Sequence, residues 1–235
     1  MIDCISVENM RQSDAYTIAN FVPSLELMYR AAYGVFMAGN WQGKTAIVVG
    51  SGNNGGDGFA LACILKEKGY ECTVFTVSRK LSPDSAYYAE KTKNAGVPVV
   101  EFFHGCLAGY SNVVDCLLGT GFQGSVREPY RTAMVEINAA DAFTISVDIN
   151  SGMNGDTGDA ELAVKSDLTV TIGYIKTGLV TSNAGKYIKK LVCADIGIQL
   201  LQEEYKILLP GEKSNEKWKY LQYPEWLDPM IIKSY

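Results

Sequence analysis

The strongest constraint on the fold is a short apolar run, Thr45-Ala-Ile-Val-Val49, which lies between Gly43 and Gly50. A run of this length without polar alternation is typical of a parallel strand that is covered on both faces. Further runs of this kind follow along the chain, separated by stretches with helical spacing. Parallel neighbours need long crossover connections, which are usually helices. The alternation therefore predicts an α/β protein with a mainly parallel sheet and right-handed crossovers.

The expected elements cover most of the chain. Residues 7–40 are predicted to be helical, with a break at Pro23, because apolar residues recur there at three- and four-residue spacing. Ser82 and Pro83 mark the start of another helix. Strands are expected at residues 45–49, 72–77, 97–103, 112–118, 142–149, 168–172 and 189–194, and helices at residues 14–21, 24–37, 59–68, 82–95 and 129–140.

Composition and charge exclude several classes of protein. The chain has 235 residues, of which 47% are apolar and 20% charged, as is ordinary for a globular domain. The net charge is −5 and no basic stripe occurs, so nucleic-acid binding is not expected. No segment resembles a membrane span or a signal peptide, so we expect a cytoplasmic protein without membrane association.

The cysteines and the histidine argue against a disulfide framework and a zinc site. The six cysteines include no CxxC pair and lie in apolar or strand-like contexts, which predicts buried, reduced thiols. His104 is the only histidine, whereas zinc sites need clusters of His or Cys.

A glycine-rich segment, residues 50–58, follows the first predicted strand and opens a helix. Glycines there allow positive φ angles and close approach of a ligand, and a helix N-terminus attracts phosphate. The segment contains GxGxxG, but the acidic residue expected about twenty positions later is missing, since Ser78 and Arg79 stand there. Asp57 would place negative charge where a pyrophosphate should lie, unless it caps the helix. The segment therefore differs from an ordinary dinucleotide site.

Two further turns follow later strands. Gly119-Thr-Gly-Phe-Gln-Gly124 comes after the strand that contains Asp115, and Asp148-Ile-Asn-Ser-Gly152 comes after another strand. Each is also compatible with a plain turn, and Asp148 with an Asx turn. Because the carboxyl ends of parallel strands share one edge, we expect a common cleft where the strand order reverses. Its oxygen-rich side chains predict a bound K⁺, Mg²⁺ or Ca²⁺. These side chains are Asn53, Asp57, Asp115, Asp148 and Ser151.

Taken together, these motifs resemble the YjeF N-terminal domain family over roughly residues 10–200. That family comprises the NAD(P)H-hydrate epimerases and includes the apolipoprotein A-I-binding protein. The residues that carry the resemblance are Asn53-Asn54-Gly55-Gly56-Asp57-Gly58, Asp115 before Gly119-Thr120-Gly121, Val147-Asp148 with Ser151-Gly152, and Thr171-Ile-Gly173 with Lys176-x-Gly178-Leu179.

The resemblance implies a Rossmann-like three-layer α/β/α sandwich over residues 1–210, followed by an aromatic tail at residues 211–235. It implies a homodimeric, K⁺-binding isomerase that interconverts the R and S epimers of hydrated NADH and NADPH. One K⁺ per subunit would be held by Asn53, Asp115 and Ser151. The implied substrate-binding residues are Asn53, Asn54, Gly55, Gly56, Asp57, Gly119, Thr120, Gly121, Phe122, Gln123, Gly124, Ser125 and Asp148.

Several expectations about partners follow from the family. Many bacterial members are fused to an ADP- or ATP-dependent dehydratase; since no such domain follows residue 235, we expect a separate dehydratase to act downstream. Arg79 is a candidate contact to a 2′-phosphate, while the preference between the NADH and NADPH hydrates stays open. The family's LMENAG segment is replaced by Leu27-Met-Tyr-Arg-Ala-Ala32, so Tyr29 and Arg30 stand in place of Glu and Asn.

The chemistry of the hydrate suggests which residues act. Its C6 hydroxyl lies beside the ring nitrogen, so an acid can release it as water and water can return to the opposite face. One side chain can perform both proton transfers. Asp148 is the candidate, and Lys176 either orients it or is a solvated loop lysine.

Two other functions remain open. An NAD(P)-dependent oxidoreductase is disfavoured by the missing ribose-binding acid and by the charge of Asp57. A non-catalytic nucleotide-binding or protein-interaction module of the same fold is the main alternative. The aromatic tail is expected either to pack on the domain or a partner subunit, or to be partly ordered; its aromatic residues are Trp218, Tyr220, Tyr223, Trp226 and Tyr235.

Overall fold

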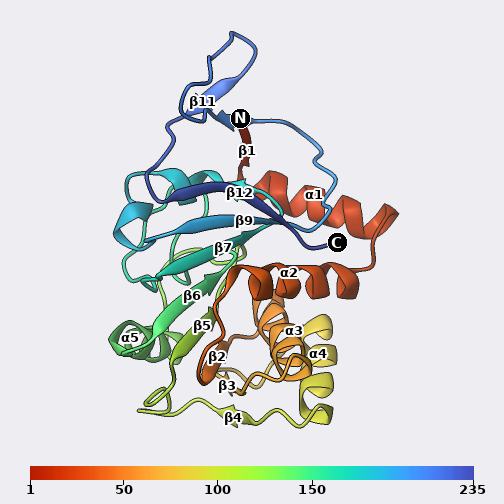
Figure 1. Ribbon diagram of the computed structural model, residues 1–235, viewed down its shortest axis with the longest axis vertical. Helices are drawn as coiled ribbons and strands as arrows, with labels where there is room; N and C mark the ends of the chain where they lie inside the picture. The colour runs from red at the N-terminus through yellow and green to blue at the C-terminus, as the bar shows by residue number, and fades with distance from the viewer.

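The computed structural model describes residues 1–235 and is built on one large parallel sheet (Figure 1). Its eight strands follow the order β12-β9-β7-β6-β5-β2-β3-β4, and every neighbouring pair is parallel. The predicted sheet is therefore confirmed. The strands are β2 (Thr45–Val49), β3 (Cys72–Thr76), β4 (Val99–Glu101), β5 (Asn112–Cys116), β6 (Phe143–Val147), β7 (Leu168–Ile172), β9 (Leu191–Asp195) and β12 (Leu227–Lys233).

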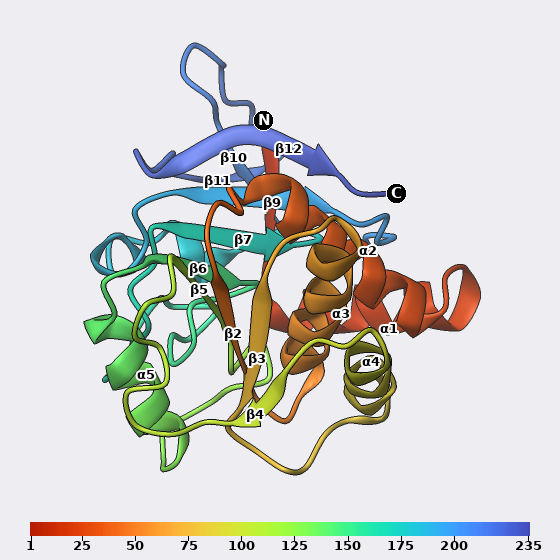
Figure 2. The ribbon, with the colours of Figure 1, turned by 60° about the horizontal axis from the view of Figure 1, so that its bottom comes forward.

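Helices cover both faces of this sheet, as a Rossmann-like α/β fold requires (Figure 2). Alternate residues of β2 show the two faces: Ile47 and Val49 pack in the core under α2, α3 and α4, whereas Ala46 and Val48 pack under α5. All are fully buried. The helices are α2 (Ser24–Ala38), α3 (Asn53–Glu67), α4 (Pro83–Asn94) and α5 (Tyr130–Ala139).

The strand order reverses between β2 and β5. From β2 the chain adds β3 and β4 on one side, then returns to place β5, β6, β7, β9 and β12 on the other. The turns after β2 and β5 therefore diverge from a common point, which is where ligands bind in open parallel sheets.

A second sheet covers part of the α5 side of the main sheet and was not predicted. Its order is β11-β10-β1-β8, and β1 pairs antiparallel with β10 and parallel with β8. It buries Cys4, Ile175 and Ile207 against Leu191 and Cys193 of the main sheet. The strands are β1 (Ile2–Ile5), β8 (Ile175–Lys176), β10 (Tyr205–Ile207) and β11 (Lys219–Leu221).

Helix α1 (Val7–Asn20) is fastened by polar contacts to a distant segment. Asn9, Ser13 and Thr17 recur every fourth residue and so share one face of the helix. Their side chains bond the backbone of residues 199–202: the Asn9 amide donates to the carbonyl of residue 202, and the hydroxyls of Ser13 and Thr17 accept from the amides of residues 201 and 199. Helix α1 is thereby held along the edge of the domain.

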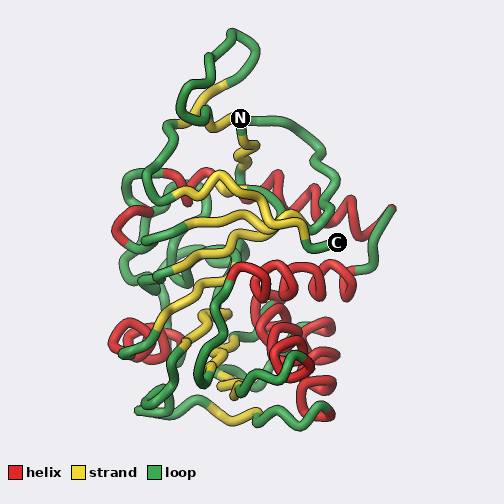
Figure 3. The backbone as a smooth tube through the Cα atoms, in the orientation of Figure 1, coloured by secondary structure: helices red, strands yellow, loops and turns green.

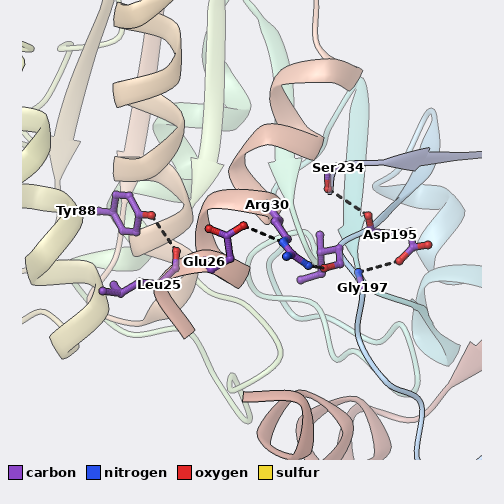
Figure 4. Close-up of polar contacts among 8 residues, drawn as sticks. Leu25, Glu26, Arg30, Tyr88, Asp195, Gly197 and Ser234 are labelled. Atoms are coloured by element: carbon purple, nitrogen blue, oxygen red, sulfur yellow. Dashed lines mark hydrogen bonds and ion pairs between the residues drawn. The ribbon is translucent and has the colours of Figure 1, made fainter. Parts of the chain in front are cut away.

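The C-terminal tail packs on its own domain. Strand β12 extends the main sheet beside β9, and the last residues reach back toward α2 (Figures 1 and 4). The amide and hydroxyl of Ser234 both donate to the Asp195 carbonyl. Arg30 donates to Glu26 and to the carbonyl of Ile196, and its guanidinium lies 5.5 Å from the Tyr235 ring centroid.

Two further predictions from the sequence concern the cysteines and membrane-spanning segments. All six cysteines are free thiols, and only Cys63 is incompletely buried. None of the helices, which are red in Figure 3, combines the length and apolarity needed to cross a membrane.

Candidate active site

A cavity of about 710 Å³ opens at the carboxyl ends of the parallel strands, beside the point where the strand order reverses. The turns after β2, β5 and β6 all contribute to its wall. The structure thus brings together three turns that lie far apart in the sequence. The predicted site residues that line this cavity are Asn53, Asn54, Asp57, Gly119, Thr120, Gly121, Phe122, Gln123, Asp148 and Lys176.

Other predicted site residues lie elsewhere. Gly124 lines a second cavity of about 490 Å³, which shares Phe122 and Gln123 with the first. Ser125 is exposed and lines neither cavity. Arg79 forms an ion pair with Glu101 at 3.1 Å and is also outside both cavities.

The glycine-rich segment is a helix rather than a loop, so the predicted helix start at residue 59 is wrong. Helix α3 begins at Asn53, Gly52 is its N-cap, and no glycine between residues 50 and 58 has a positive φ. These glycines instead allow close packing. A Cβ at Gly55 would collide with the carbonyl of Gly50, and a Cβ at Gly58 would lie 2.8 Å from a Val49 methyl.

The two asparagines at the start of α3 have different surroundings. Asn53 is exposed, and its Oδ1 accepts a 2.6 Å hydrogen bond from Ser82. Asn54 is buried, yet neither its amide nitrogen nor its carbonyl oxygen has a hydrogen-bond partner. Buried amides are rarely left unpaired, because an unsatisfied polar group costs about 1–3 kcal/mol. The unpartnered Asn54 side chain, which lines the cavity, is therefore a candidate contact to a ligand.

Asp115 lies at the end of β5 in a network of hydrogen bonds. Its carboxylate accepts from the Ser151 hydroxyl and amide at 2.5 and 2.9 Å, and from the Ser146 hydroxyl at 2.9 Å. The amide of Leu117 donates a fourth bond at 3.2 Å. Burial raises the pKa of Asp115, whereas these hydrogen bonds lower it. No cationic side chain of the protein pairs with this carboxylate, although Ser151 joins it directly to the turn after β6.

Asp148 and Lys176 form an ion pair at the cavity wall. Lys176 Nζ lies 2.5 Å from Asp148 Oδ1, and the lysine side chain is only 1% exposed. It also donates to the Thr171 hydroxyl and the Ile172 carbonyl, so the interpretation of Lys176 as a solvated loop residue is wrong. Asp148 has φ +68°, a left-handed conformation that is uncommon outside glycine and is often found at functional sites. The fold thus fixes one carboxylate at the cavity wall.

Three further carboxyl groups, those of Asp14, Asp57 and Asp84, line the same cavity. Burial raises the pKa of Asp57 well above its usual range, and the negative charges of Asp148 and Asp14 raise it further. Burial also raises the pKa of Asp14, which lies on α1. Asp57 lies one turn inside α3 and does not cap it. Sequence reasoning missed Asp14, although Met10, Asp14 and Ile18 follow the four-residue spacing of a single helix face.

The residues that differ from the expected LMENAG segment lie outside the cavity. Tyr29 is exposed and stacks on Tyr33. Arg30 points to the C-terminal side of the domain, where it contacts Glu26 and the backbone near Gly197 (Figure 4). No direct contact of these two side chains with a ligand in the cavity is therefore expected.

The protein contains no cluster of three or more His, Cys, Asp and Glu side chains that could hold a metal ion.

Fold and site together define a Rossmann-like α/β protein with an acid–lysine pair and an open helix N-terminus at the switch point of its sheet. Residues 24–178 match the model of the family described as YjeF-related protein N-terminus. The chain belongs to this family.

Curated relatives agree with this assignment. The NAD(P)H-hydrate epimerase of Limosilactobacillus fermentum is 35% identical over 81% of this chain and 95% of its own length. That of Lentilactobacillus buchneri is 35% identical over 84% and 96%. The bifunctional NAD(P)H-hydrate repair enzyme of Archaeoglobus fulgidus is 41% identical over 73% of this chain, and the match spans only 37% of that enzyme.

A solved structure shares the fold. The crystal structure of yeast ynu0, YNL200c, superimposes with a TM-score of 0.67 and covers 75% of this chain and 83% of its own, at 21% sequence identity.

Proposed function

We propose that the chain is an NAD(P)H-hydrate epimerase that interconverts the R and S epimers of hydrated NADH or NADPH. Membership of its family makes it an isomerase of the epimerase class. The observation that carries the finer proposal is the Asp148–Lys176 pair at the wall of the cavity. This pair places a fixed carboxylate beside the uncapped N-terminus of α3, so acid–base and phosphate-binding groups share one cleft.

The coenzyme's phosphates are proposed to bind between the start of α3 and the turn after β5. Gly52 provides no side-chain cap, so the first backbone amides of this 15-residue helix are free to donate to an anion. Residues 119–123 form the facing wall. The hydrated ring would then lie toward Asp148, because Asn54 and Asp148 both approach Gly119.

Asp148 is proposed to be the general acid and base. On its side of the ring it protonates the C6 hydroxyl of one epimer while the ring nitrogen forms a double bond to C6, and in the opposite direction of the reaction it takes a proton from the water that adds to C6. Lys176 holds the carboxylate in place through its bonds to Thr171 and Ile172. A positioned acid–base group of this kind contributes about 10²–10⁴ in rate.

The residues present fit one bound K⁺ per subunit. Asp115 is a buried carboxylate without a cationic partner, and Ser151 contacts it. Asn54, with its unpartnered carbonyl oxygen, is a better third ligand than Asn53, whose Oδ1 already accepts from Ser82. A hard cation binds oxygen ligands of this kind and would supply the positive charge that this buried region lacks.

We further propose that the protein acts in the cytoplasm as a homodimer. Its product would be consumed by an ADP- or ATP-dependent dehydratase. The name of the archaeal relative, a bifunctional hydrate repair enzyme, supports the pairing of this activity with a second repair activity.

The decisive assay adds purified R hydrate to the protein, with and without K⁺, and follows the S form by chromatography against an enzyme-free control. We expect interconversion faster than in the control, and faster still with K⁺. Binding of nucleotides without any interconversion would contradict the proposal and favour a non-catalytic binding module.

A further inference from the structure

We propose that Asp14 of helix α1 is a second acid–base group of this site, acting on the face of the coenzyme ring opposite to Asp148. The inference rests on the proposed epimerase function. It assigns a role to a wall of the cavity that the sequence motifs do not include, since α1 precedes all of them.

The reaction itself requires proton transfer on two faces. Inversion at C6 removes the hydroxyl from one side of the ring and adds water to the other. A carboxylate that is held rigidly, as Asp148 is by Lys176, reaches one of these sides. A group on another wall of the cavity would serve the second side.

Asp14 is placed to be that group. It lines the cavity with Met10 and Ile18 from the same helix face. Its carboxyl is partly buried and accepts no hydrogen bond from the protein, so both oxygens are free for substrate. The backbone around it is fixed, because the neighbouring Ser13 and Thr17 side chains bond residues 199–201.

Burial raises the pKa of the Asp14 carboxyl. The ionisable side chains that share the cavity are Arg11, Asp57, Asp84, Asp148 and Lys176. Among them, Lys176 lowers the pKa of Asp14 and Asp148 raises it by a smaller amount. The direction of the shift suits a carboxyl that donates a proton to substrate.

Asp57 is less suitable as the second group. It belongs to α3, whose first turn is proposed to bind the phosphates of the coenzyme. Asp14 comes from α1, which forms a separate wall of the cavity.

The proposed steps balance. The Asp14 carboxyl donates its proton to the C6 hydroxyl, the C6–O bond breaks, and the nitrogen lone pair forms a double bond to C6 as water leaves. Water then attacks C6 from the other face, Asp148 accepts its proton, and the electron pair returns to nitrogen. Asp14 is left ionised and Asp148 protonated, which is the arrangement that the reverse epimerisation needs.

The test measures inversion and oxygen exchange together in ¹⁸O-labelled water. We expect Asp14→Asn to slow inversion by about 10²-fold or more. Exchange of the C6 oxygen with retention should persist for one epimer through Asp148, so the ratio of exchange to inversion rises. Asp14→Glu should restore most of the inversion. Glu8→Gln, which alters an exposed carboxylate of the same helix outside the cavity, should leave both rates within twofold of wild type.

Unchanged inversion in Asp14→Asn would overturn the inference, and so would an equal fall of inversion and exchange, which indicates a merely structural role. Far-ultraviolet circular dichroism and NADPH binding by fluorescence check that the variant is folded. If the wild-type protein itself fails to invert the hydrate, the proposed function fails instead.

Discussion

At the scale of single residues, the charged Lys176 side chain is almost completely buried. Removing an ammonium group from water costs several kcal/mol unless partners replace the water. Asp148, Thr171 and the Ile172 carbonyl supply these partners within 2.5 to 3.1 Å. If Asp148 moved away, the buried charge of Lys176 would be left unpaired. This cost holds Asp148 in place and helps to maintain its left-handed backbone.

The first prediction concerns Asp148→Asn. Asparagine tolerates the left-handed conformation, so the backbone should be preserved. We expect turnover of the hydrate to fall by about 10²–10⁴ because no proton can be exchanged at this position. Nucleotide binding should remain.

Rapid-quench chromatography of the epimers measures turnover, and ligand fluorescence measures binding. Glu101→Gln is the control, since it removes an exposed carboxylate that pairs only with Arg79. Near-normal turnover of Asp148→Asn would show that another group performs the chemistry.

The residues of this site differ in how far the sequence alone reveals them. Asp148 and Asn54 lie in recognisable motifs beside predicted strand ends, so they could be found before the fold was known. Asp14 could not, because its helix is only weakly amphipathic and buries polar residues. Its place at the cavity depends on the contacts of this helix with residues 199–202.

At the scale of elements, α3 forms a helix although its first residues have low helix propensity. Three of its first six residues are glycines, each of which costs up to about 1 kcal/mol relative to alanine in a helix. Packing overrides this cost, because the glycines let the helix approach β2, β5 and α2 closely. This is why the sequence predicted a loop here, whereas the strands around it were predicted within two or three residues at most ends.

The second prediction uses two glycines at this junction. A Cβ at Gly50 would overlap the backbone carbonyl of Leu117, whereas a Cβ at Gly52 meets no atom within 4 Å. We expect Gly50→Ala to lower the free energy of unfolding by about 1–3 kcal/mol or more through overpacking. Gly52→Ala should change it by less than about 1 kcal/mol.

Urea unfolding followed by circular dichroism measures both variants. Equal stability of the two would contradict the close approach of β2 and β5 at the site.

The small second sheet illustrates the limit of local patterns. Strand β1 pairs with β10 about two hundred residues later, as in Ile2 opposite Ile207. Its strands have only two to four residues, too few for a periodic signal. Only the folded chain reveals that they belong together.

At the scale of the whole molecule, the C-terminal tail ties the two sheets. Trp226 donates from its indole to the carbonyl of Leu179, and its backbone carbonyl accepts from Leu191 at the start of β9. The indole ring also lies against Gly185. The tail that looked separable in the sequence is thus an edge of the main sheet.

The third prediction tests this tie. Trp226→Ala should lower the free energy of unfolding by about 2–3 kcal/mol, somewhat less than for a fully buried tryptophan because this one is half-buried. Trp218→Ala is the control, since Trp218 contacts mainly Lys206 and Lys217, and should cost about 1 kcal/mol or less. Thermal and urea unfolding measure the difference. Equal losses in the two variants would contradict the role of Trp226.

The hydrogen bonds between α1 and residues 199–202 have a consequence for biosynthesis. The ribosome makes this helix well before the segment that secures it, since 182 residues separate Thr17 from Gln199. A nascent polypeptide can therefore assemble most of the parallel strands while α1 is not yet bonded to residues 199–202. Catalytic competence would arise only after that segment has emerged.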